Sequence, residues 1–164
     1  MRTKKIINFT PVLIILTCIF IASFIFGCAR RGAEEPAYSK EVAEKILISI
    51  NNDDYDSVSS YFSDEFKNSI KQMVDSETNK AYTSEKEAFI NGICKPLKNK
   101  IGEYQPGTLK FERTLTEKGY TSVFYLAKFS KEKQGDVTFQ LVFQEINGKM
   151  LISGMWFSSK TLRQ

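Results

Sequence analysis

The chain has 164 residues, with 23 Lys and Arg, 19 Asp and Glu, no histidine and a formal net charge of +4. The absence of histidine excludes Ser-His-Asp and Cys-His nucleophilic systems and every metal site that uses imidazole. Removing Arg2, Lys4 and Lys5 at the start from the 23 basic residues leaves 20 against 19 acidic ones. A near-neutral remainder without clustered basic residues predicts no nucleic-acid partner.

The first 27 residues have the layout of an export signal. Three basic residues lie among the first five, an apolar run covers Val12–Phe26, and Gly27-Cys28 ends it. Ile25-Phe26-Gly27-Cys28 resembles the lipobox of bacterial lipoproteins, although Phe26 occupies a position that is usually small. The resemblance implies cleavage before Cys28 and a diacylglycerol thioether on its sulfur. It also implies a cell-envelope protein, lipid-anchored on the extracytoplasmic side of a bacterial membrane.

An uncleaved membrane helix is the alternative interpretation, because Ile6–Gly27 is long enough to cross a bilayer. Pro11 and the short uninterrupted run after it favour the cleaved signal. Both interpretations place the remaining chain outside the cytoplasmic membrane, because a basic start stays on the cytoplasmic side. We therefore expect a lipoprotein signal peptide over 1–27, the lipidated Cys28 with a polar tether over 28–38, and one domain over 39–164.

Helical patterns dominate the first half of this domain. Ser39 is placed to cap a helix over Lys40–Asn51, whose apolar residues recur at three- and four-residue steps. A second helical segment is predicted over Tyr55–Phe62, with a restart at Ser63, and the polar stretch Asp75–Thr83 is predicted to be a loop.

A longer helix follows. Ser84-Glu85-Lys86-Glu87 matches a capping box, in which Ser84 bonds the amide of Glu87 and Glu87 reaches back. Pro96 is predicted to kink or divide this helix, and Gly102 to end it. Cys94 lies in its apolar pattern, which predicts a buried core thiol.

From Thr108 the hydrophobic period changes to two, which is typical of strands. Four strands are expected, near Leu109–Leu115, Tyr120–Phe129, Val137–Glu145 and Met150–Phe157. Asn147-Gly148 between the last two is a strong hairpin signal of type I′. Helices followed by four strands with short connections predict an α+β fold with an antiparallel meander.

This order of elements resembles the cone-shaped NTF2-like fold. The stretch Val42–Phe66, with Asp54-Tyr55-Asp56 after its first helix, is similar to small uncharacterised bacterial lipoproteins of that fold. The resemblance implies N-terminal helices packed on a curved four-stranded antiparallel meander, with a pocket on its concave face. Enzymes of this fold place an Asp or His in that pocket as general acid or base.

Candidate site residues are few. Arg113 falls on the apolar phase of its strand, so it is expected to point into the concave face as a cation for an anionic ligand. The alternative is a rim Arg whose stem covers apolar surface. Tyr125 and Trp156 are candidates to line the same pocket, or to serve as core residues.

Other polar groups suggest no chemistry. The strand acids Glu112, Asp136 and Glu145 alternate out of phase or lie in turns, and are expected to be solvated. Asn51–Asp56 offers several oxygen ligands but lacks the glycine and the final glutamate of a calcium loop, so helix capping explains it. No metal, cofactor or catalytic residue is predicted.

The sequence thus predicts a non-catalytic module that binds a small apolar or anionic ligand or an envelope protein. One alternative is an enzyme of the ketosteroid-isomerase or dehydratase type, which needs an acid on the concave face. Another is an architectural homodimer held by an uncleaved membrane helix.

Overall fold

The structure, a computed structural model, describes residues 30–32, 34–74 and 81–164. The predicted signal, Cys28 and most of the expected loop at 75–83 lie outside these residues. Contacts join Arg31–Gln164 into one unit, which therefore includes residues that the sequence assigned to the tether. Among the described residues, no helix combines the length and apolar composition needed to cross a bilayer.

The first helix, α2 (Ser39–Asn52), buries the predicted apolar stripe, including Ala43, Ile46 and Ile50. Ser39, however, is not its cap. Its side chain makes no capping bond but is buried, and its hydroxyl donates to the Pro36 carbonyl at 2.7 Å. The helix ends at Asp53, which adopts a left-handed φ of 56°.

The second helical segment is shorter than predicted. It consists of turns and the 3₁₀ helix η1 (Ser59–Tyr61), after which Phe62 is extended and pairs with Ile152. The restart is confirmed, because the Ser63 hydroxyl accepts the Phe66 amide at 3.1 Å and opens α3 (Asp64–Lys71).

The capping box opens α4 (Glu85–Ala88), where the Ser84 hydroxyl accepts the Glu87 amide at 3.1 Å. The Glu87 carboxylate reaches back one residue further than predicted, to the Thr83 amide at 2.8 Å. The chain continues through a π-helical segment, η2 (Phe89–Cys94), into α5 (Lys95–Ile101), which ends at Gly102 with φ 82°. The wider π turn accommodates Pro96, which lacks an amide and crowds the carbonyl four residues earlier.

The sheet has the strand order β1-β2-β3-β4-β5. A short β1 (Arg30–Gly32) lies beside β2 (Lys110–Glu117), followed by β3 (Tyr120–Ala127), β4 (Val137–Ile146) and β5 (Lys149–Ser158). Strands β2 to β5 pair in sequence and antiparallel. Asn147 and Gly148 both have positive φ, as the predicted I′ turn requires.

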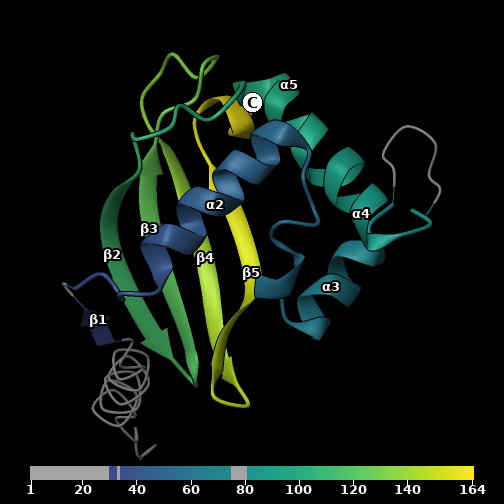
Figure 1. Cartoon of the computed structure of the whole chain (residues 1–164). Coiled ribbons are helices and arrows are strands. Elements are labelled where there is room, and N and C mark those ends of the chain that lie inside the picture. Colours follow the sequence, from purple (N-terminus) through teal and green to yellow (C-terminus); the bar gives the residue numbers. More distant parts are fainter. Residues whose placement is uncertain (1–29, 33, 75–80) are drawn as a thin grey trace, which may run out of the picture. The chain divides into compact units, whose positions relative to one another are not determined.

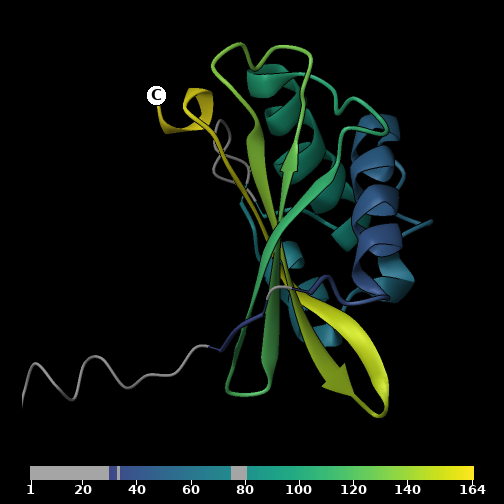
Figure 2. The same cartoon turned by 90° about the vertical axis from the view of Figure 1, so that its left-hand side faces the viewer.

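Helices α2 to α5 cover one face of the sheet, and among the described residues none of these helices lies on the other, which we call the open face (Figures 1 and 2). Alternate residues such as Val123, Tyr125, Phe139 and Leu141 face the helices and are fully buried. A short 3₁₀ helix, η3 (Thr161–Arg163), ends the chain. The predicted α+β fold with a four-stranded meander is confirmed, in the element order of the NTF2-like fold.

Candidate functional site

An apolar pocket of about 290 Å³ lies between α3, η2 and β5. Its described lining residues are apolar except for one serine: Phe66, Ser69, Ile70 and Met73 from α3 and its end, Ile93 from η2, and Met155, Trp156 and Phe157 from β5. Two methionines give the pocket flexible, polarisable walls that adapt to differently shaped apolar groups. This pocket is the candidate binding site.

The pocket lies alongside the edge of β5. Met155 and Phe157 face the helices, because they pair with the inward-facing Leu141 and Phe139. Trp156 points to the open face and is 54% exposed. Successive side chains of a strand alternate between faces, so a cavity that touches three in a row must lie beside the strand rather than above one face.

The three residues predicted to share a pocket are not brought together. Trp156 lines the pocket at the edge of β5, whereas Tyr125 is buried beneath the helices. Arg113 pairs with Phe124 on the open face, where its guanidinium lies 4.0 Å from the Phe124 ring centre and binds Glu112. A bulge between Phe111 and Arg113 shifts the register by one residue and so moves Arg113 to the opposite face.

Tyr125 forms a buried polar contact with the segment before α2. Its hydroxyl donates to the Ser39 hydroxyl at 2.8 Å. Burial raises the pKa of Tyr125 above its ordinary value, the Ser39 bond opposes this, and the nearby Glu35 carboxylate raises it further. Glu35 Oε1 is buried without a hydrogen-bond partner among the described residues. Sequence analysis missed this acid beside the covered sheet face, because it lies in a polar segment without periodicity.

The other titratable groups lie where the sequence predicted. Glu112, Asp136 and Glu145 are exposed. Cys94 is fully buried, and burial raises the pKa of its thiol to about 12. The described residues contain no group of three potential metal-binding side chains of Cys, Asp or Glu.

The acidic turn after α2 is held by internal contacts. Asp53 binds Lys98 at 2.7 Å, Asp54 accepts the Ser57 amide at 3.2 Å, and Asp56 binds Lys86. Two of the acids of this stretch thus pair with lysines of other helices, and the third closes a local turn.

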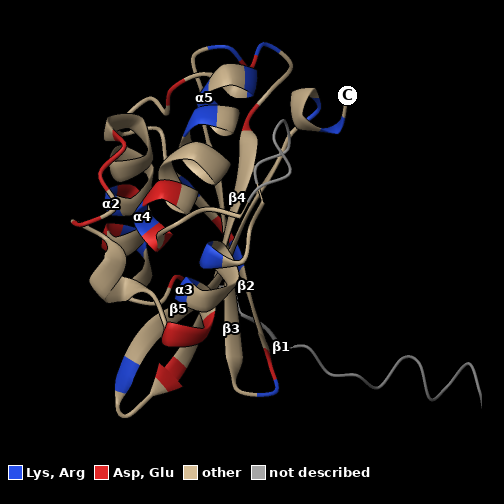
Figure 3. Ribbon diagram, turned by 90° about the vertical axis from the view of Figure 1, so that its right-hand side faces the viewer, with Lys and Arg blue, Asp and Glu red and all other residues tan. Residues whose placement is uncertain are grey.

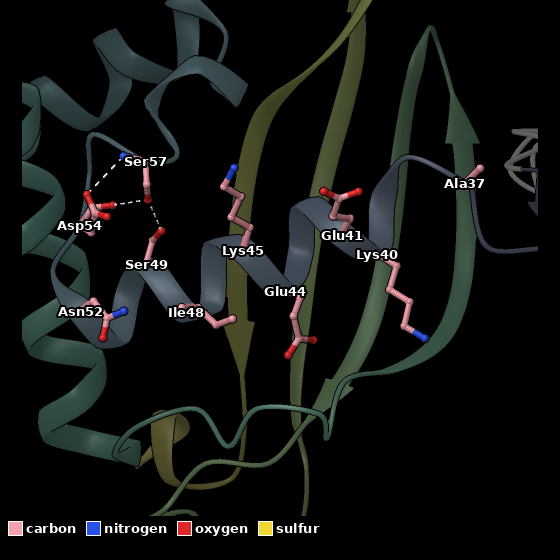
Figure 4. A pocket seen from close by; sticks show the side chains of 10 residues that line it. All are labelled: Ala37, Lys40, Glu41, Glu44, Lys45, Ile48, Ser49, Asn52, Asp54 and Ser57. Carbon is pink, nitrogen blue, oxygen red and sulfur yellow. Dashed lines mark hydrogen bonds between the residues drawn. The ribbon is translucent and has the colours of Figure 1, made fainter.

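A second hollow runs along the exposed face of α2 (Figure 4). Its described lining comes from α2, Ala37 before it and the turn after it, so one helix supplies almost the whole wall. Several of its polar groups already bind neighbours: Ser49 and Ser57 share a hydrogen bond of 2.7 Å, and Glu44 accepts the Tyr104 hydroxyl at 2.7 Å. We therefore take the edge pocket as the stronger candidate.

Comparisons with known proteins bear on the family rather than the activity. No curated protein matches the chain. A solved structure named Rd1NTF2_05, with five substitutions in its full name, is similar with a TM-score of 0.43 and 14% identity, over 73% of this chain and 96% of that one. The model of a family described as "Protein of unknown function (DUF3887)" matches residues 43–155, which is more than half of the chain. The chain therefore belongs to the DUF3887 family.

Proposed function

We propose that the protein is a non-catalytic binding module of the bacterial cell envelope, anchored by a lipid on Cys28. In this proposal the pocket at the edge of β5 takes an apolar group of a small molecule or of an envelope protein. The observation that supports it is the pocket itself, because a concave apolar site is the usual form of a ligand site.

The side chains that line the pocket favour binding rather than catalysis. Ser69 is the single polar side chain among the described lining residues, and its hydroxyl donates to the Glu65 carbonyl of its own helix at 3.0 Å. A general acid or base would need a titratable group within hydrogen-bond reach of the reacting atom. Glu35 contacts Tyr125 beneath the helices and is not among the residues that line this pocket.

The anchoring part of the proposal rests on the lipobox-like sequence. The Thr114 hydroxyl donates to the Glu34 carbonyl at 3.3 Å, and the Tyr38 ring lies 5.2 Å from that of Phe143. The short strand β1 and the contacts of Arg31–Gln164 extend the domain further toward Cys28, so three peptide units separate Arg31 from Cys28. A span of at most about 11 Å is available to them at roughly 3.3–3.6 Å per residue. A lipid on Cys28 would thus hold the domain close to the membrane.

Trp156 is the single tryptophan of the chain and lines the pocket, so it reports binding directly. The test is titration of the full chain with anilinonaphthalene sulfonate, followed by energy transfer from Trp156 to the probe. Ser69→Phe would fill the pocket from an exposed helix position, and we expect it to weaken binding at least tenfold. Asn68→Phe, one position earlier on the same exposed helix and outside the lining, is the matched control.

Equal affinity of the two variants would contradict the pocket assignment. Anchoring is checked separately by the intact mass of membrane-extracted protein beside a Cys28→Ser version. We expect loss of residues 1–27 and a gain of acyl mass that the variant lacks. A full-length, unacylated mass in both would contradict the lipid anchor and favour the membrane-helix alternative.

A further inference from the structure

Strand β5 is the last strand of the sheet, so one of its sides pairs with β4 and the other is a sheet edge. The fold itself uses the beginning of this edge. Phe62 forms a parallel bridge with Ile152, and the Ser63 amide donates to the Ile152 carbonyl at 2.9 Å. Beyond Ile152, no backbone group of the described residues outside β4 bonds to β5.

The pairing stops because the chain turns away. Ser63 caps α3, so the chain stops pairing with the edge of β5 at this point. It continues as a helix that lies beside the strand (Figure 1). The space left between the edge and α3 is the apolar pocket, with Ile70 on the helix side and Met155 on the strand side. A groove flanked by a strand edge and an apolar wall has the form of a peptide site.

The edge has only one of the usual protections against strand pairing, a bulge at its start. Exposed edges are normally blocked by charges, prolines or bulges. No charged residue and no proline lies between Lys149 and Lys160, which leaves this part of β5 uncharged (Figure 3). The bulge of the β4–β5 pair lies at Ser153, before the pocket-lining residues Met155, Trp156 and Phe157.

We infer that the outer edge of β5 beyond Ile152 binds an extended segment of a partner polypeptide as an added strand, with one apolar side chain in the pocket. This inference rests on the proposed function and states which class of partner the pocket binds. Every second residue of an edge strand directs an amide and a carbonyl outward, which another backbone satisfies and an apolar small molecule does not. Since side chains of the added strand alternate, one would enter the pocket while its neighbours lie toward Trp156.

A second copy of the chain fits this edge less well. Pairing β5 with its own copy would bring a second α3 and η2 alongside the same groove, which the first α3 already flanks. A single extended segment needs only the spacing of one strand, about 4.8 Å.

The test uses the full chain and a capped seven-residue peptide of alternating threonine and valine with a central leucine. Its control is the same peptide methylated on the three central backbone nitrogens, which keeps the side chains and removes the donors. We expect the first peptide to slow amide exchange in β5 between Ser153 and Ser158 at least tenfold, and the methylated peptide to leave it unchanged. Ser69→Phe should weaken peptide binding at least tenfold, and Asn68→Phe should not.

Three results would overturn the inference. They are equal binding of the methylated peptide, no slowing of β5 exchange by the first peptide, and concentration-dependent slowing without peptide, which would assign the edge to a second copy. If anilinonaphthalene sulfonate still binds and responds to Ser69→Phe in those cases, the proposed apolar site stands without the strand. Loss of both responses removes the two proposals together.

Discussion

The indole of Trp156 lies over Gly154, two residues earlier on the same face of β5. A Cβ added to Gly154 would overlap the Cη2 and Cζ3 atoms of the Trp156 ring. A glycine inside a strand often marks such a close approach. Gly154 therefore lets the exposed indole lie flat along the strand, beside the pocket that Trp156 lines.

Gly154→Ala is expected to displace the indole. Because the obstructing atoms are the far end of a half-exposed side chain, the ring can move, and unfolding free energy should fall by only about 1 kcal/mol. We expect Trp156 emission to shift to longer wavelength and affinity for anilinonaphthalene sulfonate to change several-fold. Ser158→Thr, which adds a methyl on the other side of Trp156 on the same face, should change neither quantity, and unchanged emission in Gly154→Ala would contradict the stacking.

The hydrophobic periodicity of the sequence predicted the helices and strands. A β-bulge, which interrupts that periodicity, made the prediction for Arg113 wrong. The alternation over β2 placed Arg113 with Phe111, but the bulge between them reverses the face of every later residue of that strand. A bulge inserts one unpaired residue and leaves no periodic signal. The apolar stripe of α2 was visible for the opposite reason, because its packing follows the helical period throughout.

The pocket could not be predicted because it lies where elements distant in sequence meet. Ile70, Ile93 and Met155 each read as ordinary core residues in their own segments. What leaves Ile93 and Met155 partly uncovered is the turn of the chain at Ser63, away from the edge of β5. Only Trp156 was selected beforehand, as an aromatic residue in the last strand.

The Asn51 side chain connects α2 to the loop before β2 through two hydrogen bonds, and its replacement should destabilise the fold. Its amide nitrogen donates to the Tyr104 carbonyl at 2.8 Å, and its oxygen accepts the Tyr104 amide at 2.9 Å. Asn51→Ala leaves both backbone groups of a buried residue unpaired, at a cost of about 2–4 kcal/mol. Urea denaturation should show this loss, while Asn52→Ala, at the exposed next position, should stay within about 0.5 kcal/mol of the parent. Equal stability of the two variants would contradict the role of Asn51.

The C-terminal η3 should depend on pH through Glu132. Its carboxylate accepts the Gln134 amide at 3.0 Å and the Thr161 amide at 3.3 Å. Hydrogen bonds, that from the Ser159 side chain foremost, lower the pKa of Glu132 from 4.5 to about 2. The folded pKa lies below the unfolded one, so the stabilisation is present above pH 4.5 and is lost as pH falls toward 2. We expect the amide resonances of Thr161 and Leu162 to shift over this interval, and to show no such step in Glu132→Gln.

Cys94 should be unreactive toward thiol reagents in the folded protein. Its side chain is fully buried and its thiol pKa is raised to about 12. The thiolate is the reactive form, and at pH 8 only about one thiol in ten thousand would be ionised at that pKa. A disulfide reagent should therefore leave native Cys94 unmodified for hours, while the exposed Lys95→Cys variant reacts at once.

The same reagent counts the thiols of the unfolded chain. In guanidinium chloride the wild-type chain should react with one equivalent of reagent if residues 1–27 are removed and Cys28 carries its lipid. An unprocessed chain would react with three equivalents of reagent, at Cys18, Cys28 and Cys94. Rapid native labelling of Cys94 would contradict its burial, whereas three equivalents after unfolding would contradict the processing and leave the burial intact.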